Sequence, residues 1–243
     1  MNKRPTIILA LILAVAIFAT APLTQALILY DGSLDTTPDT QGWLTYAVLS
    51  GSPNVSATGG ELIFDTTSTP SEVAFYTNHQ PTVAGNPLVN PAFPPMPRSG
   101  AGTMIRLDLQ VLDESHTNST AGFSWNVITD DERGFELDFW KDHIWGSGPT
   151  HVLEESTVWD TTSGLIQYDL NISGDTYTLE TGSNVLLTGP LRDYRPFNLS
   201  NVVSIGDNTG AAGAKVAISR LEILPEPALM GVIAAIGLLV RRR

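Results

Sequence analysis

Met104–Leu112, which reads MIRLDLQVL, contains the alternation that decides the fold. Apolar residues occupy positions 105, 107, 109 and 111, and Arg106, Asp108 and Gln110 stand between them. Because successive side chains of a β-strand point to opposite faces, this pattern places one face in a hydrophobic core and the other in water. The stretch therefore predicts a long β-strand in a sheet that is covered on one side.

The same alternation continues along the rest of the chain. It occurs in Gly122–Thr129, in Phe135–Trp140 and in Leu165–Ile172. No long stretch between the two termini shows helical periodicity, and Gly, Asn and Asp turns separate the apolar runs. This pattern is typical of an all-β protein, an antiparallel β-sandwich of the jelly-roll kind. Further strands are predicted at Leu27–Tyr30, Trp43–Leu49, Glu61–Asp65, Val73–Thr77, Asp175–Glu180, Asn184–Leu187, from Val202 onward and at Lys215–Leu224.

A proline-rich loop interrupts the strands between residues 80 and 102. It holds six of the sixteen prolines and is too long for an ordinary hairpin turn. Two interpretations stay open, a rim loop above a binding surface and a disordered insertion. We favour the rim, because Leu88, Val89, Phe93 and Met96 supply apolar side chains with which the loop can dock.

Charge and composition exclude several classes of function. Residues 27–224, the predicted β-sandwich domain, contain eight basic and 24 acidic residues, which is a net charge of −16. Such a surface argues against binding to nucleic acid, whose phosphates need Lys and Arg. The chain has no cysteine, which excludes disulfides, thiolate metal sites and a cysteine nucleophile. The histidines show no close metal-type pair, which argues against zinc.

The C-terminus has the organisation of a sorting signal. Pro225-Glu226-Pro227 precedes an uncharged apolar run at 228–240, and Arg241, Arg242 and Arg243 end the chain. The run predicts a short transmembrane helix, and the positive charge of the arginines holds their end in the cytoplasm. The alternative is a buried C-terminal helix of a soluble domain, which an apolar run ending on three arginines fits poorly.

This tail, residues 225–243, resembles the PEP-CTERM sorting domain of exported bacterial proteins. The resemblance implies a Gram-negative-type cell in which an exosortase, a membrane protease-transpeptidase, cuts near Pro225-Glu226-Pro227. It also implies delivery to the outer membrane, cell surface or extracellular matrix after transient anchoring in the inner membrane. Proteins of this family are often found in cells that make extracellular polysaccharide.

The N-terminus supports the same route. Lys3 and Arg4 precede an apolar segment from Ile7 to Ala21, which predicts a helical signal peptide over residues 1–26. Small residues at Thr24 and Ala26 suit signal peptidase, so cleavage is predicted after Ala26. The alternative is a permanent membrane anchor, and both alternatives place the middle of the chain outside the cytoplasm.

A second resemblance lies near the end of the domain. A strand that ends in Gly206-Asp207-Asn208, a turn of small residues and a closing strand at Lys215–Leu224 resemble the end of concanavalin A-like and laminin-G-like modules. Residues 189–194 resemble a segment seen in other PEP-CTERM proteins. These likenesses imply a jelly roll, and the fold by itself does not imply lectin activity.

The strand at Glu136-Leu137-Asp138-Phe139-Trp140-Lys141 is the best candidate for chemistry. It resembles the Glu-x-Asp-x-x-Glu strand of laminarinase-like glycoside hydrolases, which implies one carboxylate as nucleophile and a second as acid/base. In this sequence Lys141 occupies the position of the second glutamate, and a retaining mechanism needs two carboxyl groups. We therefore predict a protein that is not an enzyme and keep a laminarinase-like glycan hydrolase as the alternative.

Carbohydrate binding is the milder prediction for the same strand. Glu136, Asp138 and Trp140 alternate onto one face, where an indole can stack on a sugar ring and carboxylates can accept from its hydroxyls. The alternative is that Trp140 packs under the proline-rich loop as a core residue. Polar residues that could share this face from neighbouring strands are Asp108, Asn126, Asp169 and Asn171.

Calcium is the cofactor for which the sequence offers ligands, although no motif requires one. Hard oxygen ligands occur in several turns, but aspartate and asparagine also occur in turns for local reasons, so no metal site is predicted. The turn residues concerned are Asp35, Asp39, Asp130, Asp131, Asp207 and Asn208.

For the whole chain, we predict an exported surface or matrix protein that binds extracellular polysaccharide. Besides the glycan hydrolase, the remaining alternative is a purely structural surface protein that binds no small ligand.

Overall fold

The computed structural model describes residues 26–48, 54–70, 73–80, 88–89, 93–99, 102–116 and 120–224. The predicted signal peptide lies outside these residues except for Ala26, and so does the sorting signal at 225–243 with its predicted helix. Within the described ranges, no helix combines the length and the hydropathy that a membrane span needs.

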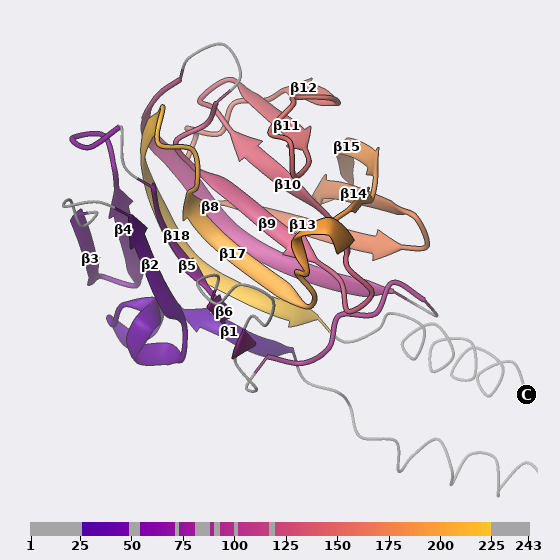
Figure 1. The fold of residues 1–243 in the computed structure, drawn as a ribbon. Helices are drawn as coiled ribbons and strands as arrows, with labels where there is room; N and C mark the ends of the chain where they lie inside the picture. Colours follow the sequence, from indigo (N-terminus) through magenta and orange to yellow (C-terminus); the bar gives the residue numbers. More distant parts are fainter. Residues whose placement is uncertain are drawn as a thin grey trace, which may run out of the picture.

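Two antiparallel sheets form a β-sandwich (Figure 1). The first sheet has the strand order β15-β14-β13-β8-β18-β4-β3, and β1 pairs with one end of β18. Its centre is the long pair β8 and β18, so the stretch that opened the sequence analysis lies in the middle of the sheet. Its strands are β1 (Leu27–Asp31), β3 (Asn54–Thr58), β4 (Glu61–Asp65), β8 (Thr103–Ser115), β13 (Ile166–Ser173), β14 (Thr176–Thr181), β15 (Asn184–Pro190) and β18 (Gly213–Leu224).

The second sheet has the order β12-β11-β10-β9-β17-β5-β2, and the short β16 pairs with the start of β10. Three short 3-10 helices, η1 (Gly32–Leu34), η2 (Pro38–Gln41) and η3 (Arg195–Phe197), lie in the connections of the described chain. A separate two-stranded sheet joins β6 (His79–Gln80) to β7 (Leu88–Val89). The strands of the second sheet are β2 (Leu44–Val48), β5 (Val73–Thr77), β9 (Ser124–Ile128), β10 (Arg133–Phe139), β11 (His143–Ser147), β12 (Ser156–Val158), β16 (Arg192–Asp193) and β17 (Val202–Asp207).

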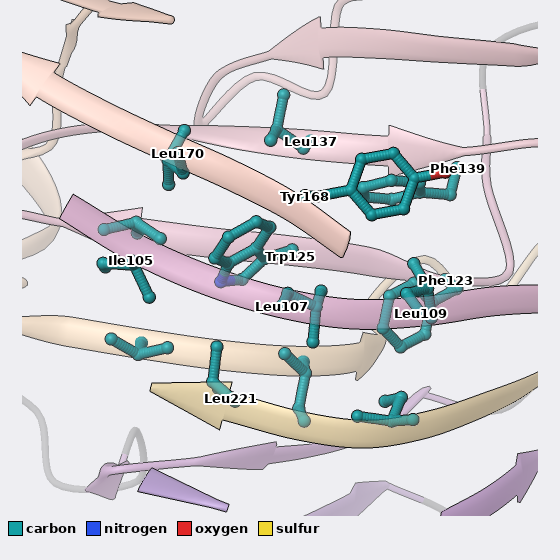
Figure 2. Packing of buried hydrophobic residues seen from close by; sticks show 14 of the residues in the cluster. Ile105, Leu107, Leu109, Phe123, Trp125, Leu137, Phe139, Tyr168, Leu170 and Leu221 are labelled. Carbon is teal, nitrogen blue, oxygen red and sulfur yellow. The ribbon is translucent and has the colours of Figure 1, made fainter. Parts of the chain in front are cut away.

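The core fills the space between the two sheets (Figure 2). The four alternating apolar residues of β8, at positions 105, 107, 109 and 111, are fully buried and face those of β9 and β10, among them Trp125, Leu137 and Phe139. Each fully buried side chain of this size contributes roughly 1.5–3 kcal/mol relative to an exposed one. The prediction of an antiparallel β-sandwich is thus confirmed, and the alternation predicts correctly which face of each central strand is buried.

Among the strands that the sequence did not predict are β3 and β11. In β3, Asn54–Thr58, the small and polar residues alternate only between exposed and partly buried positions at a sheet edge. In β11, Ile144 is the one large apolar residue that faces the core. Both strands form because a neighbouring strand offers backbone hydrogen bonds. The hydrophobic pattern of a segment does not show whether such a partner strand is present.

The proline-rich loop docks through the apolar residues singled out in its second half. Phe93 packs edge-on against Trp43 with ring centroids 5.0 Å apart, and Met96 is 1% exposed. Asn201 fastens the segment, because its side chain accepts from the Met96 backbone N–H at 2.8 Å and donates to the Pro94 carbonyl at 3.0 Å. Residues 93–99 are therefore part of the packed structure.

Candidate functional site

A row of polar side chains crosses the outer face of the second sheet. Glu136 of β10 pairs with Asn126 of β9, Asn126 pairs with Ser204 of β17, and Ser204 pairs with Thr77 of β5. The residues before and after Glu136 are buried in the core. Because side chains alternate along a strand, core packing itself directs this row to the other face.

A pocket of about 220 Å³ lies over this row. One wall comes from the connection between β11 and β12, which supplies Pro149 and His151. Another comes from the segment that follows β16, with Tyr194 and the exposed Phe197. The lining residues are Phe75, Thr77, Asn126, Ile128, Glu136, Pro149, His151, Tyr194, Phe197, Leu199, Val202, Ser204 and Asn208. The pocket thus combines apolar walls with a polar floor, which is the composition typical of small-ligand sites.

Glu136 is the carboxyl group of the pocket floor. Its side chain is 2% exposed. Asn208 Nδ2 donates to its Oε1 at 2.6 Å, and His151 Nδ1 lies 3.5 Å from its Oε2. The interaction with Glu136 raises the pKa of His151, because the carboxylate stabilises the imidazolium form. The Glu136 carboxylate therefore favours the protonated form of His151 at the wall of the pocket.

Asp138 lies on the same face, two residues further along β10. It is 4% exposed, and its Oδ2 accepts a hydrogen bond from Ser147 Oγ at 2.9 Å. Burial raises the pKa of Asp138 well above the ordinary value, and the neighbouring Glu136 raises it further. Asp138 consequently keeps a proton at a pH where an exposed aspartate is ionised, and this proton lies beside the Glu136 carboxyl group.

Two buried polar atoms of the pocket lack a hydrogen-bond partner among the described residues. They are the hydroxyl of Tyr194 and Oδ1 of Asn208. Tyr194 is 4% exposed, and its burial, followed by the charge of Glu136, raises the pKa of its phenol, so the hydroxyl keeps its proton. An unpartnered buried polar atom costs roughly 1–3 kcal/mol.

An ion-pair cluster joins the two walls of the pocket. Arg192 of β16 donates to Glu155 at 2.6 Å and to Glu154 at 3.2 Å. Glu155 also accepts from the hydroxyl of Tyr177. The Arg192 side chain is 11% exposed, so this contact is largely shielded from water. It links the segment that carries His151 to the segment that carries Tyr194.

The structure separates Trp140 from the other two residues of the predicted sugar-binding face. Trp140 follows the end of β10 and stacks on His116 with centroids 3.8 Å apart and planes 3° from parallel. Its Nε1 donates to the Thr120 carbonyl at 3.1 Å. It is 9% exposed and is not among the lining residues of the pocket. Glu136 lines that pocket and Asp138 adjoins Glu136, whereas Trp140 belongs to an aromatic cluster at the far end of β10.

Lys141 lies outside the pocket as well. Its ammonium is 2.8 Å from Asp113, and its side chain is 44% exposed. The residue at the sequence position of the laminarinase-like second glutamate therefore does not reach the space over Glu136. A proton donor for this site has to come from another part of the chain.

The polar residues suggested as companions of Glu136 divide between the two sheets. Asn126 lies directly beside Glu136. Asp108, Asp169 and Asn171 belong to β8 and β13 of the other sheet, where Asp169 forms a two-point ion pair with Arg106. They lie on the opposite side of the sandwich and are not part of this site.

The turn carboxylates suggested for calcium do not form a cluster in the described part of the chain. No group of three or more His, Asp or Glu residues there has the arrangement that holds a metal ion. Asp207 uses both of its oxygens to accept from Thr66 and Thr209. Nothing in the described residues tests whether calcium binds elsewhere.

Sequence reasoning did not find His151 and Tyr194 as site residues. Both belong to connections rather than alternating strands, and their approach to Glu136 depends on how those connections fold back over the sheet. Asn208 was noted only as a turn residue. The signal that the sequence did offer is the Gly-Asp-Asn motif after β17, which places Asn208 just beyond a central strand.

No protein-family model and no curated protein sequence matches the chain. Solved structures do match. A carbohydrate esterase from the Shiga toxin-encoding bacteriophage phi24B has a TM-score of 0.51 and 11% identity, over 82% of this chain and 96% of that one. An endo-β-galactosidase from Clostridium perfringens that releases GlcNAcα1-4Gal has a TM-score of 0.50 and 12% identity, over 86% and 66%. A β-glucanase from Bacillus licheniformis has a TM-score of 0.43 and 9% identity, over 76% and 92%. Likeness at these identities shows the fold.

The comparisons contradict the prediction that the chain is not an enzyme. The two similar structures with TM-scores of 0.50 or more are described as a carbohydrate esterase and an endo-β-galactosidase, so chains with this fold include enzymes. The prediction had relied on Lys141 replacing a glutamate. That replacement removes one expected proton donor and leaves Glu136 with Asp138 and His151 beside it.

Proposed function

We propose that this protein hydrolyses glycosidic bonds and that the pocket over Glu136 holds the sugar ring at the bond to be cleaved. The observation that carries the proposal is a buried carboxyl pair, of which Glu136 lies at the floor of an open pocket with apolar walls and Asp138 adjoins it. When two carboxyl groups are adjacent and one keeps its proton, the two can take different roles, one as an acid and the other as a base or nucleophile. Burial of this pair costs folding free energy, and perturbed carboxyl groups beside a pocket are candidates for a binding or catalytic role.

The residues of the pocket can be given separate roles in this reaction. Glu136 attacks the anomeric carbon, and Asp138 holds Glu136 in place through its own proton. His151 donates its proton to the departing glycosidic oxygen as the bond between that oxygen and the anomeric carbon breaks. Water then attacks the anomeric carbon, frees Glu136 and returns a proton to His151.

The test is a comparison of full-length wild-type protein with the Glu136→Gln variant on a panel of polysaccharides, with release of reducing ends as the readout. Loss of the reacting carboxylate should lower the rate by roughly 10²–10⁴-fold, because glutamine can neither attack nor take up charge. Glu180→Gln is the matched control, since Glu180 lies on β14 of the other sheet. It should retain the wild-type rate.

Two results would contradict the proposal. One is a Glu136→Gln variant that is as active as wild type. The other is a protein that is retained on a polysaccharide and releases no product from it, which would leave binding without cleavage.

We also propose that the protein is exported and displayed at the cell surface, where polysaccharide is available to it. The resemblance of Pro225-Glu226-Pro227 and the following residues to a PEP-CTERM tail supports this, together with the predicted signal peptide. Signal peptidase and an exosortase would then be transient partners, and the helix at 228–240 would provide temporary contact with the membrane.

A further inference from the structure

We infer that Tyr46 and Phe75, an aromatic pair on the outer face of the second sheet, form a second binding subsite for the glycan chain whose cleaved bond lies over Glu136. The inference builds on the proposed function and adds the path that the polymer follows across the protein. Its starting point is a stacked pair of rings that stay partly exposed beside the pocket.

The pair belongs to two neighbouring strands at one side of the sheet. Tyr46 of β2 lies directly opposite Phe75 of β5, and their rings stack with centroids 4.8 Å apart and planes 30° from parallel. Ala74 and Tyr76, on both sides of Phe75, are buried in the core, so strand alternation directs Phe75 to the outer face. Both rings are partly exposed, and a ligand can therefore reach them.

Phe75 makes this aromatic surface continuous with the pocket. It lines the same pocket as Glu136. The residue of β17 that lies opposite Phe75 is Gly206, so that strand places no side chain beside Phe75 at this register. A Cβ atom on Gly206 would lie only 2.6 Å from Cα of Phe75, which means that this position requires glycine. The pocket therefore extends from Glu136 to the first ring of the pair.

The spacing of the strands sets the size of the ligand that can use both ends. Going from β10 to β5 takes three strand steps, by way of β9 and β17, and β2 is one step further. At about 4.8 Å per step, β5 lies roughly 14 Å and β2 roughly 19 Å from β10. One sugar ring over Glu136 does not extend to Tyr46, so a ligand that contacts both is a chain of several linked sugars.

On the other side of Glu136 the sheet is covered. Ser147 of β11 lies directly opposite Glu136 and is 0% exposed. The connection that follows it supplies Pro149 and His151 as a wall of the pocket. A chain bound over Glu136 therefore continues across β9, β17 and β5 toward Tyr46, and not across β11.

The chemistry of the pair suits a sugar. Aromatic rings offer a flat apolar surface on which the C–H face of a sugar ring can stack, and a tyrosine hydroxyl can both donate to and accept from sugar hydroxyls. The other role open to such a pair is to stabilise the sheet, since aromatic residues on opposite strands also favour strand pairing. Affinity and thermal stability distinguish the two roles.

The experiment uses full-length protein in native gels that contain laminarin or galactan, where retardation measures affinity. Tyr46→Ala should lower the affinity for the polymer that retards wild type by about tenfold, because one stacking surface is lost. Tyr46→Phe retains the ring and should keep most of the wild-type affinity. Melting temperatures of both variants, measured without polymer, show that each is folded at the temperature of the gel.

Thr45→Ala is the matched control. Thr45 is exposed and precedes Tyr46 on β2, so its side chain points to the opposite face of the same strand. This variant should be retarded as strongly as wild type. A tyrosine with a purely structural role would give a lower melting temperature in Tyr46→Ala together with unchanged retardation.

Three outcomes overturn the inference. They are unchanged affinity in Tyr46→Ala, an equal loss of affinity in Thr45→Ala, and wild-type protein that neither polymer retards. Failure of the proposed function is recognised separately. Wild-type protein that is retarded through Tyr46 but releases no reducing ends would contradict hydrolysis and leave the subsite in place, and so would a Glu136→Gln variant with full activity.

Discussion

Asp207 shows how one residue can support the site without touching a substrate. It ends β17 with a side chain that is 0% exposed, and it holds the turn from which Asn208 reaches Glu136. Burial raises the pKa of Asp207 to about 6, although three donors from Thr66 and Thr209 act in the opposite direction. Burial of the Asp207 carboxylate, which holds Asn208 in position, therefore lowers the stability of the folded protein.

The raised pKa of Asp207 leads to a prediction for pH dependence. Between pH 3.8 and about 6 the folded protein holds a proton that the unfolded chain has released, so stability falls as pH rises through this window. The cost above the window approaches about 3 kcal/mol for a shift of this size. Asp207→Asn removes the titrating group. The free energy of unfolding of this variant minus that of wild type should therefore be larger at pH 8 than at pH 4.

Urea unfolding of both proteins at pH 4 and pH 8 measures this difference. Asp138 contributes a slope of the same sign in both, so only the difference between the proteins is informative. Parallel pH profiles would show that Asp207 is not the group responsible.

At the residue scale, the sequence predicted the carboxyl pair of the site but not the site residues that belong to the connections between strands. Glu136 and Asp138 follow from strand alternation, whereas Asn126 was one of four polar residues that could share their face, and strand pairing decides that it lies beside Glu136. Trp140 alternates in the same register, yet β10 ends at Phe139 and the indole packs against His116. Strand periodicity cannot tell where a strand ends, because the last backbone pairs depend on the neighbouring strand.

At the scale of elements, Arg192 joins two connections that the sequence separates by about forty residues. Because it is largely shielded from water, its removal leaves Glu155 without its cation in a low dielectric. Arg192→Ala should destabilise the protein by roughly 3 kcal/mol, the cost typical of breaking a buried ion pair from one side.

Arg195→Ala is the control for that change. Arg195 also pairs with a carboxylate, that of Asp193, but its side chain is 59% exposed. Exposed pairs contribute less than about 1 kcal/mol, so this variant should remain close to wild type in a chemical unfolding curve. Equal losses in the two variants would mean that the Arg192 cluster does not hold the pocket walls together.

For the whole molecule, the tail determines where the protein acts. Replacement of Glu226 by alanine, or deletion of Arg241–Arg243, should change the mature mass or trap the chain in the inner membrane, because both alter the proposed sorting signal. Mass spectrometry of fractionated cells measures this, with Glu61→Ala in β4 as the control. An unchanged mass and an unchanged location in both tail variants would disprove sorting by this signal.

The amino-acid sequence by itself determined the all-β class, the buried face of each central strand and the carboxyl pair on β10. These depend on a period of two, which is a local property of the chain. Only the tertiary structure decided that Asn126 joins Glu136 while Asp108 and Asp169 lie across the sandwich, and that His151, Tyr194 and Asn208 converge on one carboxylate. The order of strands and the return of connections over a sheet are set by packing between distant segments, and a pattern of neighbouring residues contains no record of it.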